Sequence, residues 1–170
     1  VESLPIGFFR QKASAEATWR LSKALRFQGD YAWEGWNREH REVRRTNEHI
    51  VGGRLALEPA KLFYARVGYH YGDRIPLDYN FRYEEFDLLR MFDQARRIRH
   101  DMDAFMQWQG GDRLFFSLNW QCLGDNFDQN FYGLHNYLQG QLGAELTYAL
   151  RENSNLYLGF SRERIRSDYA

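Results

Sequence analysis

The amino-acid sequence predicts an all-β protein, an antiparallel up-and-down transmembrane β-barrel segment of about eight strands. Apolar and polar residues alternate over short segments, which is the period of a strand with two different faces. The connections alternate in length, so that four hairpins have short turns at one rim and long loops at the other. Aromatic residues make up 17% of the chain. Many of them lie on the apolar face near segment ends, where a membrane barrel meets the lipid interface.

Alternation is most regular in 138–148, where leucine, alanine, glycine and tyrosine share one face and glutamine, glutamate, threonine and glycine share the other. The same period runs through 13–21 and 63–71. Five further segments alternate less regularly: 25–33, 51–57, 102–108, 114–122 and 156–160. These eight segments are the predicted strands.

The predicted connections fall into two classes. The short ones are built from turn-forming residues: 22–24, 58–61, 110–113 and 151–154. The long ones are rich in charged and aromatic residues: 34–47, 72–101 and 124–136. Because consecutive hairpins run side by side, we expect all short turns at one rim and all long loops at the other.

Composition excludes several classes of function. The chain has 23 basic and 23 acidic residues, so no net charge attracts nucleic acid. No stretch approaches the roughly 18 apolar residues of a transmembrane helix. Cys122 is the single cysteine, so the chain has no Cys-x-x-Cys-His site for haem and we expect no cofactor of its own. Because no catalytic constellation is present either, we expect no enzyme.

Histidine and aspartate are the candidate metal ligands. The five histidines lack the paired spacing of a metal site; they are His40, His49, His70, His100 and His135. A calcium site is conceivable at Asp101, Asp103, Asp125 and Asp128, but these residues lack the spacing of a calcium loop. We therefore predict no metal site.

A stripe of polar residues is predicted on one face of the sheet. It consists of Arg26, Asp30, Glu34, Arg54, Arg66, His70, Asp101, Asp103, Gln139, Gln141 and Glu145. In a membrane barrel this face lines the lumen. We expect its charges mainly to pair across neighbouring strands, with contact to a bound partner as the alternative. A soluble barrel would instead point its apolar face inward, and the period alone does not separate the two arrangements.

A basic run, 96–100, stands within one predicted loop. Four acids precede it in the same segment: Glu84, Glu85, Asp87 and Asp93. We expect internal pairing with these acids. Contact with lipopolysaccharide or with a cytochrome is the alternative.

Several segments together resemble a known family. They are YAWEGWNR at 31–38, RRTNEH at 44–49, YHYGDR at 69–74, LRMFDQARRIR at 89–99, GDNFD at 124–128 and YGL at 132–134. In this order and spacing they are similar to the MtrB/PioB family, the decahaem-associated β-barrel proteins of the bacterial outer membrane. The resemblance covers most of the chain.

The resemblance implies a barrel wall that sheathes a multihaem cytochrome and supports transmembrane, extracellular electron transfer. The haem would belong to a periplasmic multihaem c-type cytochrome in the lumen, and an extracellular cytochrome is a further candidate partner. Membrane lipid would contact the outside of the barrel. The alternatives are a diffusive outer-membrane porin for small solutes and a soluble ligand-binding β-barrel.

The strand number bears on domain organisation. A closed eight-stranded barrel is filled by its own side chains and cannot admit a cytochrome. The predicted hairpin order also puts both chain ends at the long-loop rim, whereas a membrane barrel keeps its ends at the short-turn rim. We therefore expect residues 1–170 to form a single barrel segment that is an internal part of a larger outer-membrane barrel.

Overall fold

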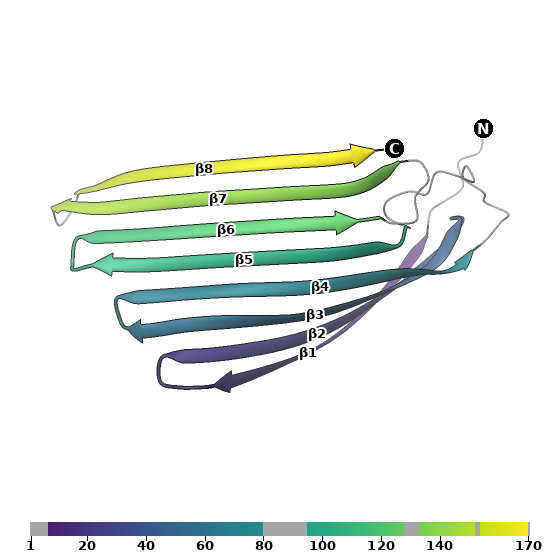
Figure 1. Cartoon of the computed structure of the whole chain (residues 1–170), viewed down its shortest axis with the longest axis horizontal. Coiled ribbons are helices and arrows are strands. Elements are labelled where there is room, and N and C mark those ends of the chain that lie inside the picture. Colours follow the sequence, from purple (N-terminus) through teal and green to yellow (C-terminus); the bar gives the residue numbers. More distant parts are fainter. Residues whose placement is uncertain (1–6, 80–94, 128–132, 152–153, 170) are drawn as a thin grey trace.

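The computed structural model of the chain describes residues 7–79, 95–127, 133–151 and 154–169. They form one antiparallel sheet of eight strands in the order β1-β2-β3-β4-β5-β6-β7-β8 (Figure 1). The strands are β1 (Phe8–Arg20), β2 (Leu25–Arg38), β3 (Val43–Ala60), β4 (Phe63–Tyr79), β5 (Arg97–Gly110), β6 (Leu114–Asn126), β7 (Leu134–Arg151) and β8 (Ser154–Tyr169). The all-β, up-and-down prediction is confirmed.

The strand ends that the short turns join lie together at one end of the sheet, as predicted (Figure 1); residues 152 and 153 of the fourth turn lie outside the described residues. In the first of them the Ser22 hydroxyl accepts hydrogen bonds from the backbone N–H groups of Ala24 and Leu25. In the third, Gly111 has φ +75°, a left-handed conformation that a residue with a Cβ adopts at a cost. Local turn chemistry therefore sets both connections.

The strands are longer than predicted at the opposite end, and this corrects the loop boundaries. The segment 34–47 is mostly strand, because β2 continues to residue 38 and β3 begins at residue 43. Parts of 72–101 and 124–136 are likewise strand: 72–79, 97–101, 124–126 and 134–136. Charged residues in these extensions pair across the sheet, as Arg10 does with Glu34 at 2.6 Å. Such pairs satisfy charged side chains on a strand, so their charge does not indicate a loop.

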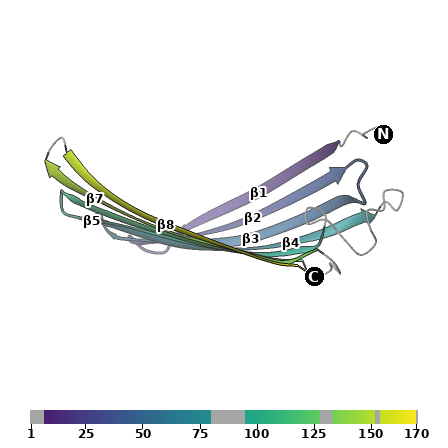
Figure 2. The same ribbon diagram turned by 90° about the horizontal axis from the view of Figure 1, so that it is seen from above.

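The described residues form a single layer with almost no hydrophobic core. Val43, Ala56, Ala95 and Phe127 are its buried hydrophobic residues. Figure 2 shows one curved sheet with no second layer of described elements on either face. Large apolar side chains are exposed instead, including Trp19 and Phe160, which are 51% and 57% exposed. A soluble sheet would have to cover such side chains.

The register assigns each side chain to a face, because directly opposite residues of an antiparallel pair point to the same side. One row across the sheet is largely apolar: Trp19, Phe27, Leu55, Val67, Ala104, Trp120, Leu142 and Arg162. The adjacent row points to the other side and is polar: Thr18, Gln28, Arg54, Gly68, Asp103, Gln121, Gln141 and Glu163. We name these sides the apolar face and the polar face.

No helix within the described ranges is both long and apolar enough to cross a membrane.

The two faces can be told apart with a spin label at neighbouring positions. Leu118 lies opposite Met106 and Ala144 on the apolar face, and Asn119 lies opposite Phe105 and Gly143 on the polar face. In a Cys122→Ser background and in vesicles, a label at Leu118→Cys should collide more with oxygen than with a water-soluble nickel complex. A label at Asn119→Cys should show the reverse preference, because we expect the polar face to line a water-filled lumen. Equal collision ratios at the two positions would refute the assignment of faces.

Candidate functional site: the polar face of the sheet

All eleven residues predicted for the polar stripe share the polar face. Direct cross-strand partners connect them, for example Arg54 with Gly68 and Asp103, and Asp30 with Gly52 and His70. Because every second residue of a strand points to the same side, the remaining residues of the stripe lie on the polar face as well. The structure brings some of these side chains into contact and leaves others apart.

A histidine and an aspartate meet over a glycine on β2, β3 and β4. Gly52 stands between Asp30 and His70 in one cross-strand row. The imidazole lies over Gly52, where a Cβ would clash with it. From there His70 Nε2 comes within 3.2 Å of Asp30 Oδ1. The missing side chain at Gly52 is therefore what allows the pair to span two strand spacings.

A second group has one carboxylate between two guanidinium groups. Asp103 lies over Gly68, where a Cβ would clash with its carboxylate. Its oxygens are 3.8 Å from Arg54 Nη2 and 3.6 Å from Arg66 Nε. These distances exceed those of hydrogen bonds. Accordingly Arg54 Nε, Arg66 Nε and Asp103 Oδ2 are buried atoms without a hydrogen-bond partner. Such atoms require water or a bound partner.

Three further stripe residues, Gln139, Gln141 and Asp101, form separate cross-strand contacts. Glu163 accepts hydrogen bonds from the amides of Gln139 and Gln141, at 2.7 and 3.0 Å. Asp101 accepts one from Gln121 at 3.3 Å. Contacts between side chains of different strands thus connect many residues of the polar face.

Two glutamates at opposite sides of the sheet also have cross-strand partners. Glu34 pairs with Arg10 and accepts a hydrogen bond from the indole of Trp36. Glu145 interacts through a hydrogen bond with Tyr157 on β8. These contacts do not connect the two glutamates with the groups around His70 and Asp103.

A buried charge network at the end of the sheet away from the short turns is not part of the predicted stripe. Asp125 accepts two hydrogen bonds from Arg99, each at 2.7 Å, and lies 3.7 Å from Arg97. Arg97 also donates to Glu48 at 2.5 Å. The side chains of Asp125 and Glu48 are 6% and 8% exposed. The network therefore joins β3, β5 and β6 through nearly buried charges.

Among the described residues, the basic run has acidic partners other than the four predicted ones. Arg97 binds Glu48 of β3, Arg99 binds Asp125 of β6, and Arg96 lies 3.8 Å from Asp73. The acids at 84, 85, 87 and 93 lie outside the described residues, so their pairing with the basic run stays a prediction. The alternation rule could have found the network, since 48, 97, 99 and 125 continue the polar period of their strands. Their charge, which is typical of loops, conceals that period.

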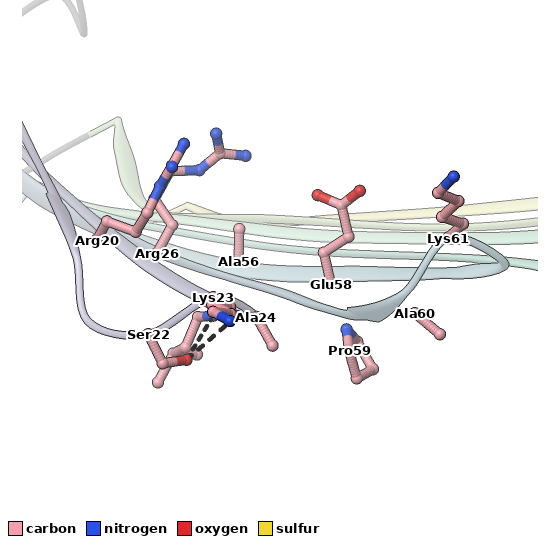
Figure 3. Close-up of a pocket in the computed structure, with 11 residues that line it drawn as sticks. Arg20, Ser22, Lys23, Ala24, Arg26, Ala56, Glu58, Pro59, Ala60 and Lys61 are labelled. Carbon is pink, nitrogen blue, oxygen red and sulfur yellow. Dashed lines mark hydrogen bonds between the residues drawn. The ribbon is translucent and has the colours of Figure 1, made fainter.

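A basic hollow lies at the short-turn rim, between β1, β2 and β3. It has a volume of about 390 Å³ and is lined by the turn residues and by Arg20, Arg26, Glu58 and Lys61. These four side chains extend to the same side of the sheet (Figure 3). Arg26 is the only stripe residue among its lining residues. The hollow is open and cationic, so it suits an anionic group better than an apolar ligand.

Metal binding finds no geometric support in the described ranges. They contain no group of three or more His, Cys, Asp or Glu side chains placed to hold a metal ion. His49 and His100 instead accept or donate hydrogen bonds with the hydroxyls of Tyr31 and Tyr69, each at 2.7 Å. Both pairs lie on the apolar face. Asp128, one of the four aspartates considered for calcium, lies outside the described residues.

Comparison with known proteins identifies one family. The family model described as "Putative outer membrane beta-barrel porin, MtrB/PioB" matches residues 2–170. No curated protein sequence matches the chain.

Proposed function

We propose that this chain, which belongs to the MtrB/PioB family of outer-membrane β-barrel porins, is a wall that sheathes a multihaem cytochrome. In this role it supports electron transfer across the bacterial outer membrane. Membership places the chain in the outer membrane and confirms the family and the location expected from its sequence. Porins form passages through a membrane and are not a class of enzymes.

The observation that carries the proposal is the sharp difference between the two faces of one layer. Lipid can cover the apolar face at no cost, whereas the polar face needs water or a polar partner. On the polar face, Asp30 and Asp103 each lie within 4 Å of a basic side chain of another strand. A wall of this kind lets a charged protein sit at membrane depth without entering lipid.

The open curvature of the sheet supports a wide lumen. Within the described residues β1 and β8 make no contact with each other, and each pairs with one neighbour only. Unpaired strand edges cost several kcal/mol for each backbone group in lipid. We therefore infer that further strands complete the barrel. A barrel of more than eight strands has the room for a partner that a closed eight-stranded barrel lacks.

The electron carrier in this proposal is the partner. Cys122 is the single cysteine of the chain, so c-type haem would be attached to another protein. The basic rim hollow around Arg20 and Lys61 lies at the short-turn end, which faces the periplasm in outer-membrane barrels. A periplasmic cytochrome would meet this rim as it enters. An acidic surface on the cytochrome would be attracted there.

The experiment is transmembrane reduction of an enclosed dye. Vesicles filled with an electron-accepting dye receive the purified barrel, the cytochrome that co-purifies with it, or both, and an impermeant reductant is added outside. We expect dye reduction only when both proteins are present, because only then does a haem chain cross the bilayer. The same vesicles with both proteins should retain a small enclosed solute, since the cytochrome fills the lumen.

Specific results would contradict the sheath. Dye reduction by the barrel alone, or the absence of any haem protein in the native complex, would do so. Rapid leakage of solute through the occupied barrel would favour the diffusive porin. The polar atoms without a hydrogen-bond partner around Asp103 support that alternative, because a water-filled channel would hydrate them.

A further inference from the structure

We propose that Arg162 and Arg164 form a site on the outside of the barrel for the phosphate groups of the outer-leaflet lipid, lipopolysaccharide. This site is separate from the polar face and does not depend on a cytochrome. It rests on the side-chain pattern of β8 and on the register between β7 and β8.

Along one side of β8 the side chains change abruptly from apolar to basic. Leu156, Leu158 and Phe160 occupy successive positions of the apolar face and are 48%, 56% and 57% exposed. The next two positions on that face are Arg162 and Arg164, both exposed. Residues that contact lipid tails must be apolar, and arginine at the middle of a bilayer is strongly disfavoured. The boundary between lipid tails and headgroups therefore falls between Phe160 and Arg162.

The arginines have no acidic neighbour on their own face among the described residues. Arg162 lies opposite Leu142, and Arg164 lies opposite Gly140. Glu163, which separates them in sequence, points to the polar face and accepts hydrogen bonds from two glutamine amides there. The next residue of the series, Arg166, is paired with Asp168 at 3.1 Å. Within the described part of the chain, two guanidinium groups without a counter-charge thus stand together at the edge of the apolar band.

The position of the two arginines in the membrane indicates which ligand they bind. β8 runs from the short turns toward the end of the sheet with the longer connections (Figure 1), which is the extracellular end of an outer-membrane barrel. The anionic groups at this depth and on this side are the phosphates of the outer leaflet. A guanidinium binds phosphate through two parallel N–H···O bonds, which makes arginine better suited than lysine to this role. The other charged side chains that the structure describes on this face are paired within the chain, as Asp73 is with Arg96.

The test is a titration of the purified full-length protein in detergent with diphosphoryl lipid A, read by tryptophan fluorescence. Removal of one charge-assisted hydrogen-bonding group should weaken binding about tenfold, so Arg162→Gln with Arg164→Gln should weaken it about 100-fold. The matched control removes two exposed arginines at the other rim, as Arg113→Gln with Arg151→Gln. It should bind like the wild type. The conservative pair Arg162→Lys with Arg164→Lys keeps the charge and should bind with intermediate affinity.

Further arms identify the ligand. Monophosphoryl lipid A should bind more weakly than the diphosphoryl form, and inorganic phosphate should not displace it. Displacement by inorganic phosphate would show a site for the free ion, and displacement by an acidic peptide would show a protein site. Either result overturns the proposal, as does equal binding of phosphatidylcholine or an equally weakened control pair. If the glutamine pair does not fold, the lysine pair decides: wild-type affinity there would also overturn it.

Discussion

Replacing Leu146 with arginine is expected to lower the free energy of unfolding by about 2–4 kcal/mol, the cost of an arginine on the lipid face near the bilayer middle. Leu146 lies opposite Phe116 and Leu158 on the apolar face. Leu142, in contrast, lies opposite Arg162, at the edge of the apolar band. Arginine at Leu142 should therefore cost less than arginine at Leu146.

The matched control is Gln141→Arg on the polar face. Gln141 lies opposite Gln121 and Glu163, so the new guanidinium faces water and an acid. We expect a change of less than about 1 kcal/mol. Urea unfolding in detergent micelles, followed by tryptophan fluorescence, gives the three values. A Gln141→Arg cost as large as that of Leu146→Arg would show that the faces have been assigned wrongly.

Replacing Asp125 with alanine is the second large effect, with an expected decrease of about 3–5 kcal/mol in the free energy of unfolding. The Asp125 side chain is 6% exposed and accepts two hydrogen bonds from Arg99. Arg97 lies 3.7 Å from the same carboxylate. Removing the acid leaves two neighbouring guanidinium groups without that counter-charge in a poorly hydrated place. The decrease should appear in the same urea titration, at the midpoint of unfolding.

Asp168→Ala is the control for a salt bridge of similar chemistry at the surface. The Arg166 and Asp168 side chains are 66% and 46% exposed. An exposed pair contributes little, because water and salt already screen it. We expect a decrease of less than about 1 kcal/mol. Similar decreases for Asp125→Ala and Asp168→Ala would mean that burial does not determine how much the Asp125 network contributes to the free energy of unfolding.

The fold and the location of the candidate site follow closely from residue order. The alternation of 138–148 predicts both faces of β7, and the pairing with β8 runs without a register shift from Leu138 to Tyr148. The short turns are equally local, since Ser22 and Gly111 act through hydrogen bonds and backbone conformation within a few residues. These signals need no distant contact, so sequence reasoning recovers them.

Strand length and the charge network could not be predicted in the same way. Arginine and glutamate in the segments 34–47 and 97–101 are typical of loops, yet most of these residues lie in strands. What holds them there is a partner on another strand. Arg97, for example, binds Glu48, which is 49 residues away in the sequence. No local pattern contains that information.

Residue order alone predicts a strand repeat with two different faces, the residues that share each face, and the family to which the chain belongs. These follow from a period of two and from local turn chemistry, which act within one strand or one hairpin. Which charged side chains meet depends on contacts between strands. The tertiary structure sets Asp103 over Gly68, joins Asp125 to Arg99 and leaves Arg162 opposite Leu142. The register between strands causes this, because it aligns residues that are far apart in the chain, and electrostatic contacts depend on that alignment.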